Sequence, residues 1–202
     1  MIGIIDYDAG NIMSVQKACA HLGFAYELTR DREKLLEADH LILPGVGSFG
    51  DAMEKLNDYG LTEVIREAAA ERKIPLLGIC LGLQLLFEES EESPGVSGLG
   101  LLPGKIRRIP DQGKTLKIPH MGWNSLSYPA PGKLFDKIPE GTDVYFVHSY
   151  YLPAGDDFIK AVTDYGVEIG ASVEKENLFA CQFHPEKSGE RGLKILDNFL
   201  RI

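Results

Sequence analysis

The first half of the chain alternates short apolar runs with longer segments whose apolar residues recur every three or four positions. The short runs predict strands and the longer segments predict helices. Strands are expected at 2–6, 25–29, 40–43 and 74–77, and helices at 12–22, 31–37, 61–72 and 83–89. We expect Asn11 to cap the first helix and Gly23 to end it. Alternating strands and helices indicate right-handed crossovers and a parallel sheet.

The second half has a different pattern, in which apolar and polar residues alternate as in half-buried strands. Strands are expected at 105–109, 143–147, 158–163, 167–173 and 178–183, followed by a closing helix at 192–200. Residues 90–104 are rich in Gly, Ser, Pro and Glu and predict a surface loop, and 119–124 looks loop-like. We therefore predict one α/β domain over residues 1–202, with a mostly parallel central sheet, flanking helices and a β-rich C-terminal half.

Composition excludes several classes of function. The net charge of −9 argues against nucleic acid or an anionic membrane as a partner. The three cysteines, Cys19, Cys80 and Cys181, are too few and too scattered for disulfide stapling, which fits a reducing cytoplasm. The N-terminus lacks the basic region of a signal peptide, and the longest uncharged apolar stretch, 74–87, is too short to cross a bilayer. We expect a cytoplasmic protein without a membrane partner.

Cys80 lies between two glycines, in Gly78-Ile-Cys-Leu-Gly82, where a predicted strand meets a predicted helix. This is the pattern of a nucleophile elbow with sulfur in place of oxygen. Glycine at both flanks permits a strained turn and close packing, and the start of a helix favours the thiolate over the thiol. The alternative is a buried structural cysteine, which is common on apolar stretches.

A nucleophilic cysteine needs a base and a group that orients the base. Of the five histidines, His184 is the best candidate because Pro185 holds it extended, so that Glu186, two positions on, points to the same side. Cys80, His184 and Glu186 would then form a triad in which the carboxylate fixes the imidazole. The alternative is a loop histidine beside a solvated acid.

The loop Pro44-Gly-Val-Gly47 follows another predicted strand, at the sheet edge where Cys80 falls and where ligands of such sheets bind. An enzyme that forms a thioester stabilises an oxyanion with backbone N–H groups, which Leu81 and either Val46 or Gly47 could supply. The alternative is a simple turn between strand and helix. Gly45 and Gly47 do not form a phosphate loop, and no further Cys/His cluster suggests zinc. We expect no cofactor and no metal.

Taken together, these motifs resemble those of the triad-type (class I) glutamine amidotransferases. The resemblance extends to further blocks across nearly the whole chain, and these are most similar to the histidine-pathway glutaminases of that family. The blocks are Gly10-Asn-Ile-Met-Ser-Val15, Pro119-His-Met-Gly-Trp-Asn124, Tyr145-Phe-Val-His-Ser-Tyr150 and Gln182-Phe-His-Pro-Glu-Lys-Ser188. The resemblance implies a flavodoxin-like class I fold. It also implies hydrolysis of glutamine by the triad, with the ammonia passing to a cyclase subunit that has a (β/α)8 barrel.

The same resemblance implies roles for two further groups of residues. Substrate and oxyanion contacts are expected from Gly45, Val46, Gly47, Leu81, Gln84, Glu92, His148, Ser149 and Tyr150. Contacts with the cyclase are expected from Asn11, Met121, Trp123, Tyr145 and Lys187. Met121 and Trp123 could instead form a small satellite core, and Lys187 could simply be solvated. The remaining alternatives are a glutaminase subunit of another synthase, a cysteine peptidase or deglycase with the same elbow, and a binding module in which Cys80 is inert.

Overall fold

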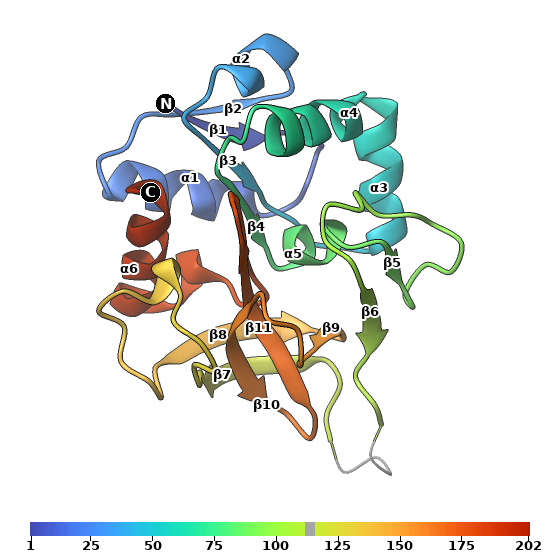
Figure 1. Ribbon diagram of the computed structural model, residues 1–202, viewed down its shortest axis with the longest axis vertical. Coiled ribbons are helices and arrows are strands. Elements are labelled where there is room, and N and C mark those ends of the chain that lie inside the picture. The colour runs from blue at the N-terminus through green and yellow to red at the C-terminus, as the bar shows by residue number, and fades with distance from the viewer. Residues whose placement is uncertain (112–115) are drawn as a thin grey trace.

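The computed structural model describes residues 1–111 and 116–202, and it contains a ten-stranded sheet with helices on both faces and a separate two-stranded sheet (Figure 1). The large sheet runs in the order β2-β1-β3-β4-β12-β11-β9-β6-β5, and β10 pairs with β11. Its first five strands are parallel: β2 (Tyr26–Thr29), β1 (Ile2–Ile5), β3 (His40–Leu43), β4 (Leu76–Ile79) and β12 (Leu178–Cys181). The parallel pairing of β2, β1, β3 and β4 confirms the prediction from the alternation of strands and helices, whereas the parallel pairing of β12, from the second half, was not predicted.

Most pairings in the rest of the sheet are antiparallel. Its strands are β11 (Glu168–Lys175), β10 (Ile159–Asp164), β9 (Tyr150–Pro153), β6 (Lys105–Arg108) and β5 (Glu89–Ser90), and only β5 and β6 pair in parallel. The two-stranded sheet joins β7 (His120–Ser125) to β8 (Asp143–His148). The predicted β-rich second half is therefore confirmed. The single domain stays a prediction, although the large sheet takes strands from both halves of the chain.

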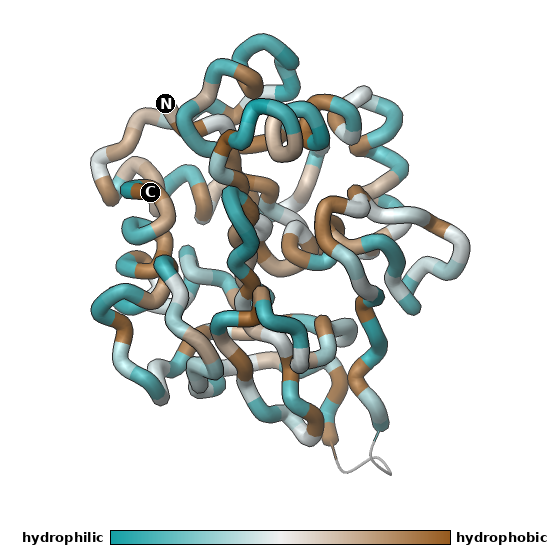
Figure 2. Tube along the Cα trace, in the orientation of Figure 1, coloured by the Kyte–Doolittle hydropathy of each residue, from teal (hydrophilic) through white to brown (hydrophobic). Residues whose placement is uncertain are grey.

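The helices lie along the two faces of the sheet. They are α1 (Ile12–His21), α2 (Arg32–Leu36), α3 (Phe49–Asp58), α4 (Leu61–Arg66), α5 (Leu81–Leu85) and α6 (Gly189–Leu200), with a π-helix at Glu67–Glu71 and 3-10 turns at Lys133–Phe135 and Pro185–Lys187. Along α6 the buried positions recur every three or four residues, and Figure 2 shows this helix alternating between hydrophilic and hydrophobic residues. None of the helices in the described ranges is long and apolar enough to cross a membrane.

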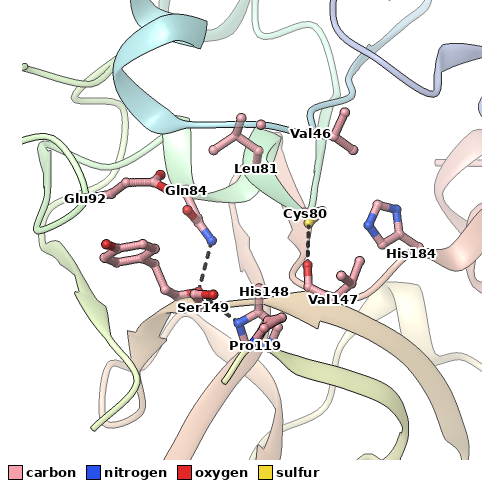
Figure 3. Close-up of a pocket in the computed structure, with 12 residues that line it drawn as sticks. Val46, Cys80, Leu81, Gln84, Glu92, Pro119, Val147, His148, Ser149 and His184 are labelled. Atoms are coloured by element: carbon pink, nitrogen blue, oxygen red, sulfur yellow. Dashed lines mark hydrogen bonds between the residues drawn. The ribbon is translucent and has the colours of Figure 1, made fainter. Parts of the chain in front are cut away.

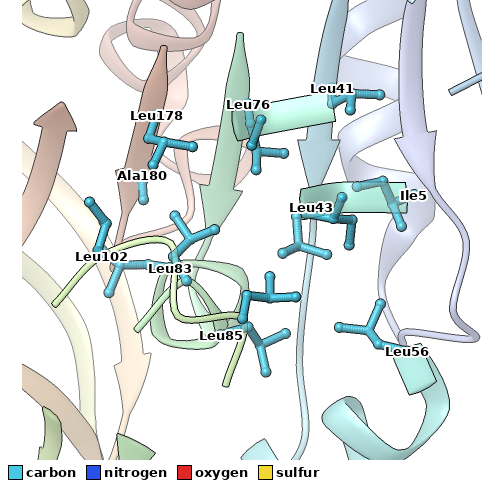
Figure 4. Close-up of a cluster of buried hydrophobic side chains, with 14 of the residues drawn as sticks. Ile5, Leu41, Leu43, Leu56, Leu76, Leu83, Leu85, Leu102, Leu178 and Ala180 are labelled. Carbon is cyan, nitrogen blue, oxygen red and sulfur yellow. The ribbon is translucent and has the colours of Figure 1, made fainter. Parts of the chain in front are cut away.

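The core is divided into two apolar layers by the parallel strands. Successive strand residues point to opposite faces, so that Leu41 and Leu43 pack with α3 and α4, whereas Ile42 packs with α1 and α6. Figure 4 shows the first layer, in which Leu76 and Leu83 lie among the same group of side chains. Because both faces are covered, these strands are apolar at nearly every position, as parallel sheets require.

Several local predictions differ from the structure. Asn11 is the N-cap residue of α1, as predicted, but it is in a left-handed conformation, and its side chain accepts a hydrogen bond from the Ser14 hydroxyl rather than from a backbone N–H of the helix. The helix after Cys80 ends at Leu85 instead of residue 89. Residues 90–104 are not simply a surface loop, because Leu99 and Leu102 are buried in the core. The loop-like stretch 119–124 is mostly strand β7, and helix α3 was not predicted.

Candidate active site

Three neighbouring parallel strands, β3, β4 and β12, end at one edge of the sheet, where their loops surround a cavity of about 360 Å³. The loop after β3 contributes Val46 and Gly47, β4 leads into Cys80, and β12 leads towards His184. The turn between β8 and β9 closes the opposite side (Figure 3). The cavity is lined by Val46, Gly47, Cys80, Leu81, Gln84, Glu92, Pro119, Val147, His148, Ser149, Tyr150 and His184.

Cys80 has the strained backbone of a nucleophile elbow. Its φ of 56° and ψ of −107° are rarely adopted by residues other than glycine. The flanking glycines are required sterically, because a Cβ atom at Gly82 would lie 1.9 Å from the carbonyl oxygen of Leu43. A Cβ atom at Gly78 would lie 2.6 Å from the carbonyl oxygen of Gly82. The turn therefore fixes the thiol at the carboxyl end of β4, in the wall of the cavity.

The thiol of Cys80 is buried and has two weak polar contacts. Its Sγ lies 3.8 Å from the carbonyl oxygen of Val147, to which the thiol donates, and 3.8 Å from Nε2 of Gln182, which donates to sulfur. The backbone N–H of Cys80 donates to the Cys181 carbonyl at 2.7 Å, which ties the elbow to β12. This pairing of neighbouring strands sets the distance between Cys80 and the segment that carries His184.

His184 and Glu186 form a buried pair whose side chains are 2% and 1% exposed. Nδ1 of His184 lies 2.8 Å from Oε1 of Glu186. His184 itself is extended, as predicted, but Glu186 lies in the 3-10 turn Pro185–Lys187 rather than in extended chain. Within the described residues Nε2 of His184 has no hydrogen-bond partner, and the imidazole lies beside Cys80 in Figure 3. The free nitrogen is therefore available to the thiol.

The electrostatic environment of His184 favours the protonated imidazole. Burial alone lowers the pKa of His184, but interactions with Cys80 and Glu186 outweigh burial and raise it to about 9. The backbone of His184 is also fixed, because its N–H donates to the Tyr145 carbonyl at 2.9 Å and its carbonyl accepts from the Ser188 hydroxyl at 2.6 Å. His184 is thus held through both its side chain and its main chain.

The loop after β3 approaches the elbow closely at Gly45. A Cβ atom there would lie 2.7 Å from the Tyr7 hydroxyl and 2.8 Å from Cβ of Leu81. Tyr7 is buried and donates to the Pro44 carbonyl at 2.7 Å, which anchors the base of the loop. Gly45 therefore lies behind the cavity wall, whereas Val46 and Gly47 line it. Among the described residues the backbone N–H of Leu81 has no acceptor, so it is free to bind an oxyanion.

Of the other predicted substrate residues, Gln84 and Glu92 lie on the side of the cavity away from His184 (Figure 3). Nε2 of Gln84 donates to the Tyr150 carbonyl at 3.0 Å and to Oε1 of Gln182 at 3.1 Å. Oε2 of Glu92 accepts from the backbone N–H of Phe49, the first residue of α3, at 2.8 Å. Burial raises the pKa of Glu92, although this hydrogen bond opposes the rise.

None of the predicted partner residues lines the cavity. Met121 and Trp123 are 62% and 58% exposed, so the alternative of a small satellite core is wrong. Trp123 contacts the ring of Tyr145 edge-on, with 6.1 Å between centroids, across the β7–β8 pairing. Asn11 is exposed and Lys187 is half-buried. We call Met121, Trp123 and Tyr145 the β7–β8 face.

Four residues at the site were not assigned roles from the sequence: Tyr7, Pro119, Val147 and Gln182. Of these, Gln182 could have been found, because it precedes His184 by two positions and such residues share one side of an extended chain. Tyr7 gave no comparable signal, since its contact with Pro44 depends on the pairing of β1 with β3.

Comparisons with known proteins identify the class. Residues 3–202 match the glutamine amidotransferase class-I family, and the chain belongs to that family. It is 54% identical over 199 residues to the imidazole glycerol phosphate synthase subunit HisH of Moorella thermoacetica, covering 98% of this chain and 93% of that protein. It is 52% identical over 206 residues to HisH of Geobacillus kaustophilus, covering 100% and 97%.

A solved structure also supports the fold. A protein described as a glutamine amidotransferase has a TM-score of 0.76 to this chain at 20% identity, covering 99% of this chain and 97% of that one. The class I fold that the motifs implied is thereby confirmed.

Proposed function

We propose that the chain is the glutaminase subunit of an imidazole glycerol phosphate synthase, which hydrolyses glutamine and passes the ammonia to a cyclase subunit. The observation that carries the glutaminase role is that Cys80 and His184 line one cavity, while Glu186 binds the other nitrogen of the imidazole. The particular synthase is proposed from the relatives named HisH, which are about half identical to the chain over nearly its full length.

Hydrolysis begins with proton transfer from Cys80 to Nε2 of His184. The sulfur attacks the side-chain amide carbon of glutamine and forms a tetrahedral intermediate. Glu186 keeps the second proton of the imidazole on Nδ1 and stabilises the imidazolium that forms, which is the carboxylate's role in a triad. The elevated pKa of His184 agrees with this role, because the neighbours of the ring favour its charged form.

The oxyanion of the intermediate is bound by the backbone N–H of Leu81 and by a second N–H from Val46 or Gly47. His184 then returns its proton to the leaving nitrogen, so ammonia departs and a γ-glutamyl thioester remains on Cys80. Water attacks the thioester with His184 as the base, which releases glutamate and restores the thiol. The sum of these steps is glutamine plus water giving glutamate plus ammonia.

The α-amino and α-carboxylate groups of glutamine are held away from the sulfur. Glu92 lies on the far side of Gln84 from Cys80 (Figure 3) and its second carboxylate oxygen is not used by Phe49. A carboxylate there is suited to the α-ammonium group of the substrate, which would offset the cost of burying the charge of Glu92. Ser149 and Tyr150 close the cavity beside it.

The cyclase subunit, a (β/α)8 barrel, docks on the β7–β8 face with Asn11 and Lys187 near the rim. Exposed tryptophan and methionine are enriched at interface centres, and Trp123 is more than half exposed here. Trp123→Ala should weaken binding of the cyclase by about 2 kcal/mol, measured by calorimetry. Ser125→Ala, on the same strand, is the control and should leave binding unchanged. The three buried free cysteines support a reducing cytoplasm as the location.

A glutaminase assay of the wild type and of Cys80→Ala, each with and without a cyclase, tests the proposed function. We expect activity only in the wild type, with strong stimulation by the cyclase and its nucleotide ligand. Equal rates with and without the cyclase would refute partner activation. Turnover of peptides or glycated substrates without a partner would instead favour the peptidase or deglycase alternative.

A further inference from the structure

A continuous series of hydrogen bonds connects strand β7 to the wall of the cavity. Nδ2 of Asn124 lies 3.3 Å from Nε2 of His120 and 2.8 Å from the carbonyl oxygen of Asp164. Nδ1 of His120 lies 3.0 Å from Nε2 of His148. Nδ1 of His148 in turn lies 2.8 Å from the carbonyl oxygen of Tyr150. Two histidines thus link β7 to a residue that lines the cavity.

The partners of these rings determine which nitrogens carry hydrogen. A carbonyl oxygen only accepts, so Nδ1 of His148 must donate to Tyr150. In a neutral imidazole the other nitrogen accepts, so Nε2 of His148 accepts from Nδ1 of His120. Nε2 of His120 then accepts from the Asn124 amide, whose second hydrogen goes to Asp164. Every donor meets an acceptor with both histidines neutral and protonated on Nδ1.

Burial supports the neutral state. His120 is 2% exposed and stacks between Tyr165 and Phe146, with ring centroids 3.9 and 4.7 Å away. Burial lowers the pKa of His120 to about 4. Burial is also the main cause that lowers the pKa of His148 to about 3. Neither ring is therefore expected to be charged at neutral pH.

The series continues from Tyr150 to the nucleophile. The Tyr150 carbonyl accepts from both His148 and Nε2 of Gln84, which uses both of its lone pairs. Gln84 also donates to Oε1 of Gln182, and Nε2 of Gln182 donates to Sγ of Cys80. The orientation of the Gln84 amide therefore depends on a carbonyl that His148 helps to hold.

We propose that His120 is a positioning residue of the glutamine site: by donating to His148 it fixes the tautomer and ring orientation of that residue, and so aligns Tyr150 and Gln84 for glutamine. This role rests on the proposed glutaminase function. His120 does not line the cavity and touches no reacting atom. Removing its donor hydrogen leaves Nε2 of His148 without a partner, so the ring is held only by the bond from Nδ1 to the Tyr150 carbonyl and can rotate or change tautomer more readily.

The first test is the tautomer of His148, read from the ¹⁵N shifts of its imidazole ring by nuclear magnetic resonance. In the wild type we expect hydrogen on Nδ1 and a lone pair on Nε2. His120→Asn places an amide donor near the former Nδ1 and should preserve this state. His120→Phe keeps the stacking without a donor and should give mixed tautomers. A wild-type His148 with hydrogen on Nε2 overturns the proposal, whether or not either variant folds.

The second test is steady-state kinetics with glutamine in the presence of the cyclase. His120→Phe should raise KM about tenfold, the equivalent of one neutral hydrogen bond, and change kcat less than about twofold. His120→Asn should restore most of the loss. The matched control is His40→Phe, because His40 also contacts a phenylalanine ring, that of Phe199, edge-on, but is the first residue of β3, at the end of the strand away from the cavity. It should leave KM unchanged.

The outcomes separate the two claims. An active wild type whose KM is the same in His120→Phe and His40→Phe would overturn the positioning role and leave the proposed function intact. A loss of kcat in His120→Phe without a change in KM would also overturn it. A wild type that is inactive towards glutamine with its cyclase would overturn both claims, and the activity assay alone would reveal it.

Discussion

Replacing Glu186 with glutamine would isolate the contribution of its charge to the proposed catalysis. The Glu186 side chain is 1% exposed and accepts from Nδ1 of His184 at 2.8 Å through Oε1, while Oε2 has no hydrogen-bond partner among the described residues. In Glu186→Gln the amide oxygen can keep the place of Oε1 and the NH2 group can take that of Oε2. The hydrogen bond and the tautomer of His184 are then preserved, and only the negative charge is lost.

The magnitude follows from replacing a charge-assisted hydrogen bond to the imidazolium by a neutral one. Charge-assisted bonds contribute about 1.5–3 kcal/mol and neutral ones about 0.5–1.5 kcal/mol, so the difference should lower kcat roughly tenfold. The pKa of His184, about 9 in the wild type, should fall as well, because one of the two groups that raise it loses its charge while burial continues to lower it. The KM for glutamine should stay the same, since Glu186 does not line the cavity.

The assay is steady-state glutamine hydrolysis with saturating cyclase, combined with titration of the His184 ring by nuclear magnetic resonance. A kcat within threefold of the wild type would refute the orienting role of Glu186. A kcat as low as that of Cys80→Ala would refute the assumption that the amide oxygen faces Nδ1, because a reversed amide would impose the wrong tautomer.

Three further predictions concern other parts of the site. Gly82→Ala should destabilise the fold by about 3 kcal/mol or more, measured by urea unfolding, because the new Cβ would lie 1.9 Å from the Leu43 carbonyl oxygen. Glu92→Gln should raise the KM for glutamine about tenfold with little change in kcat, since it loses the partner proposed for the α-ammonium group. Stability should fall between pH 6.5 and pH 5, because unfolded histidine binds a proton there while buried His120 and His148, with pKa values of about 4 and 3, do not. Between pH 6.5 and pH 5, the free energy of unfolding, measured in urea, should fall by about 2 kcal/mol less in His120→Phe than in the wild type.

Each of these predictions has a control or a contradicting result. Gly23→Ala, at a positive φ but with open space around it, should cost only about 1 kcal/mol, and equal losses for the two glycines would contradict the close contact at the elbow. A fall in kcat without a change in KM for Glu92→Gln would remove Glu92 from substrate binding. Equal acid sensitivity of wild type and His120→Phe would mean that His120 is protonated in the folded protein.

The sequence allowed prediction of the parallel half of the sheet because burial on both faces leaves an unmistakable apolar run in β1, β3 and β4. Prediction from the sequence failed at β7, where the polar residue is buried and the apolar residues are exposed. There the polar His120 points inwards and is satisfied by Asn124 and His148, while Met121 and Trp123 point outwards. A strand that buries a hydrogen-bonded histidine and exposes apolar residues lacks the hydrophobic pattern of a strand, so a hydrophobicity-based rule predicts a loop there.

The candidate triad could be predicted because its spacing is local: glycines beside Cys80, and Glu186 two positions after His184. The contacts that support it could not, because they depend on tertiary pairing. The approach of Gly45 to Tyr7 requires β1 and β3 to be neighbours, and the link from Gln84 to Gln182 joins residues that are 98 positions apart.

Trapping the covalent intermediate would show whether glutamine is hydrolysed through a thioester on Cys80. Wild-type protein with its cyclase is mixed with glutamine, quenched in acid within the first turnovers, digested and analysed by mass spectrometry. We expect a γ-glutamyl group on the peptide that contains Cys80 and no such group on the corresponding peptide of Cys80→Ala. Two results together would contradict a thioester on Cys80: rapid glutamine turnover by the wild type with no adduct at Cys80, and undiminished turnover by Cys80→Ala.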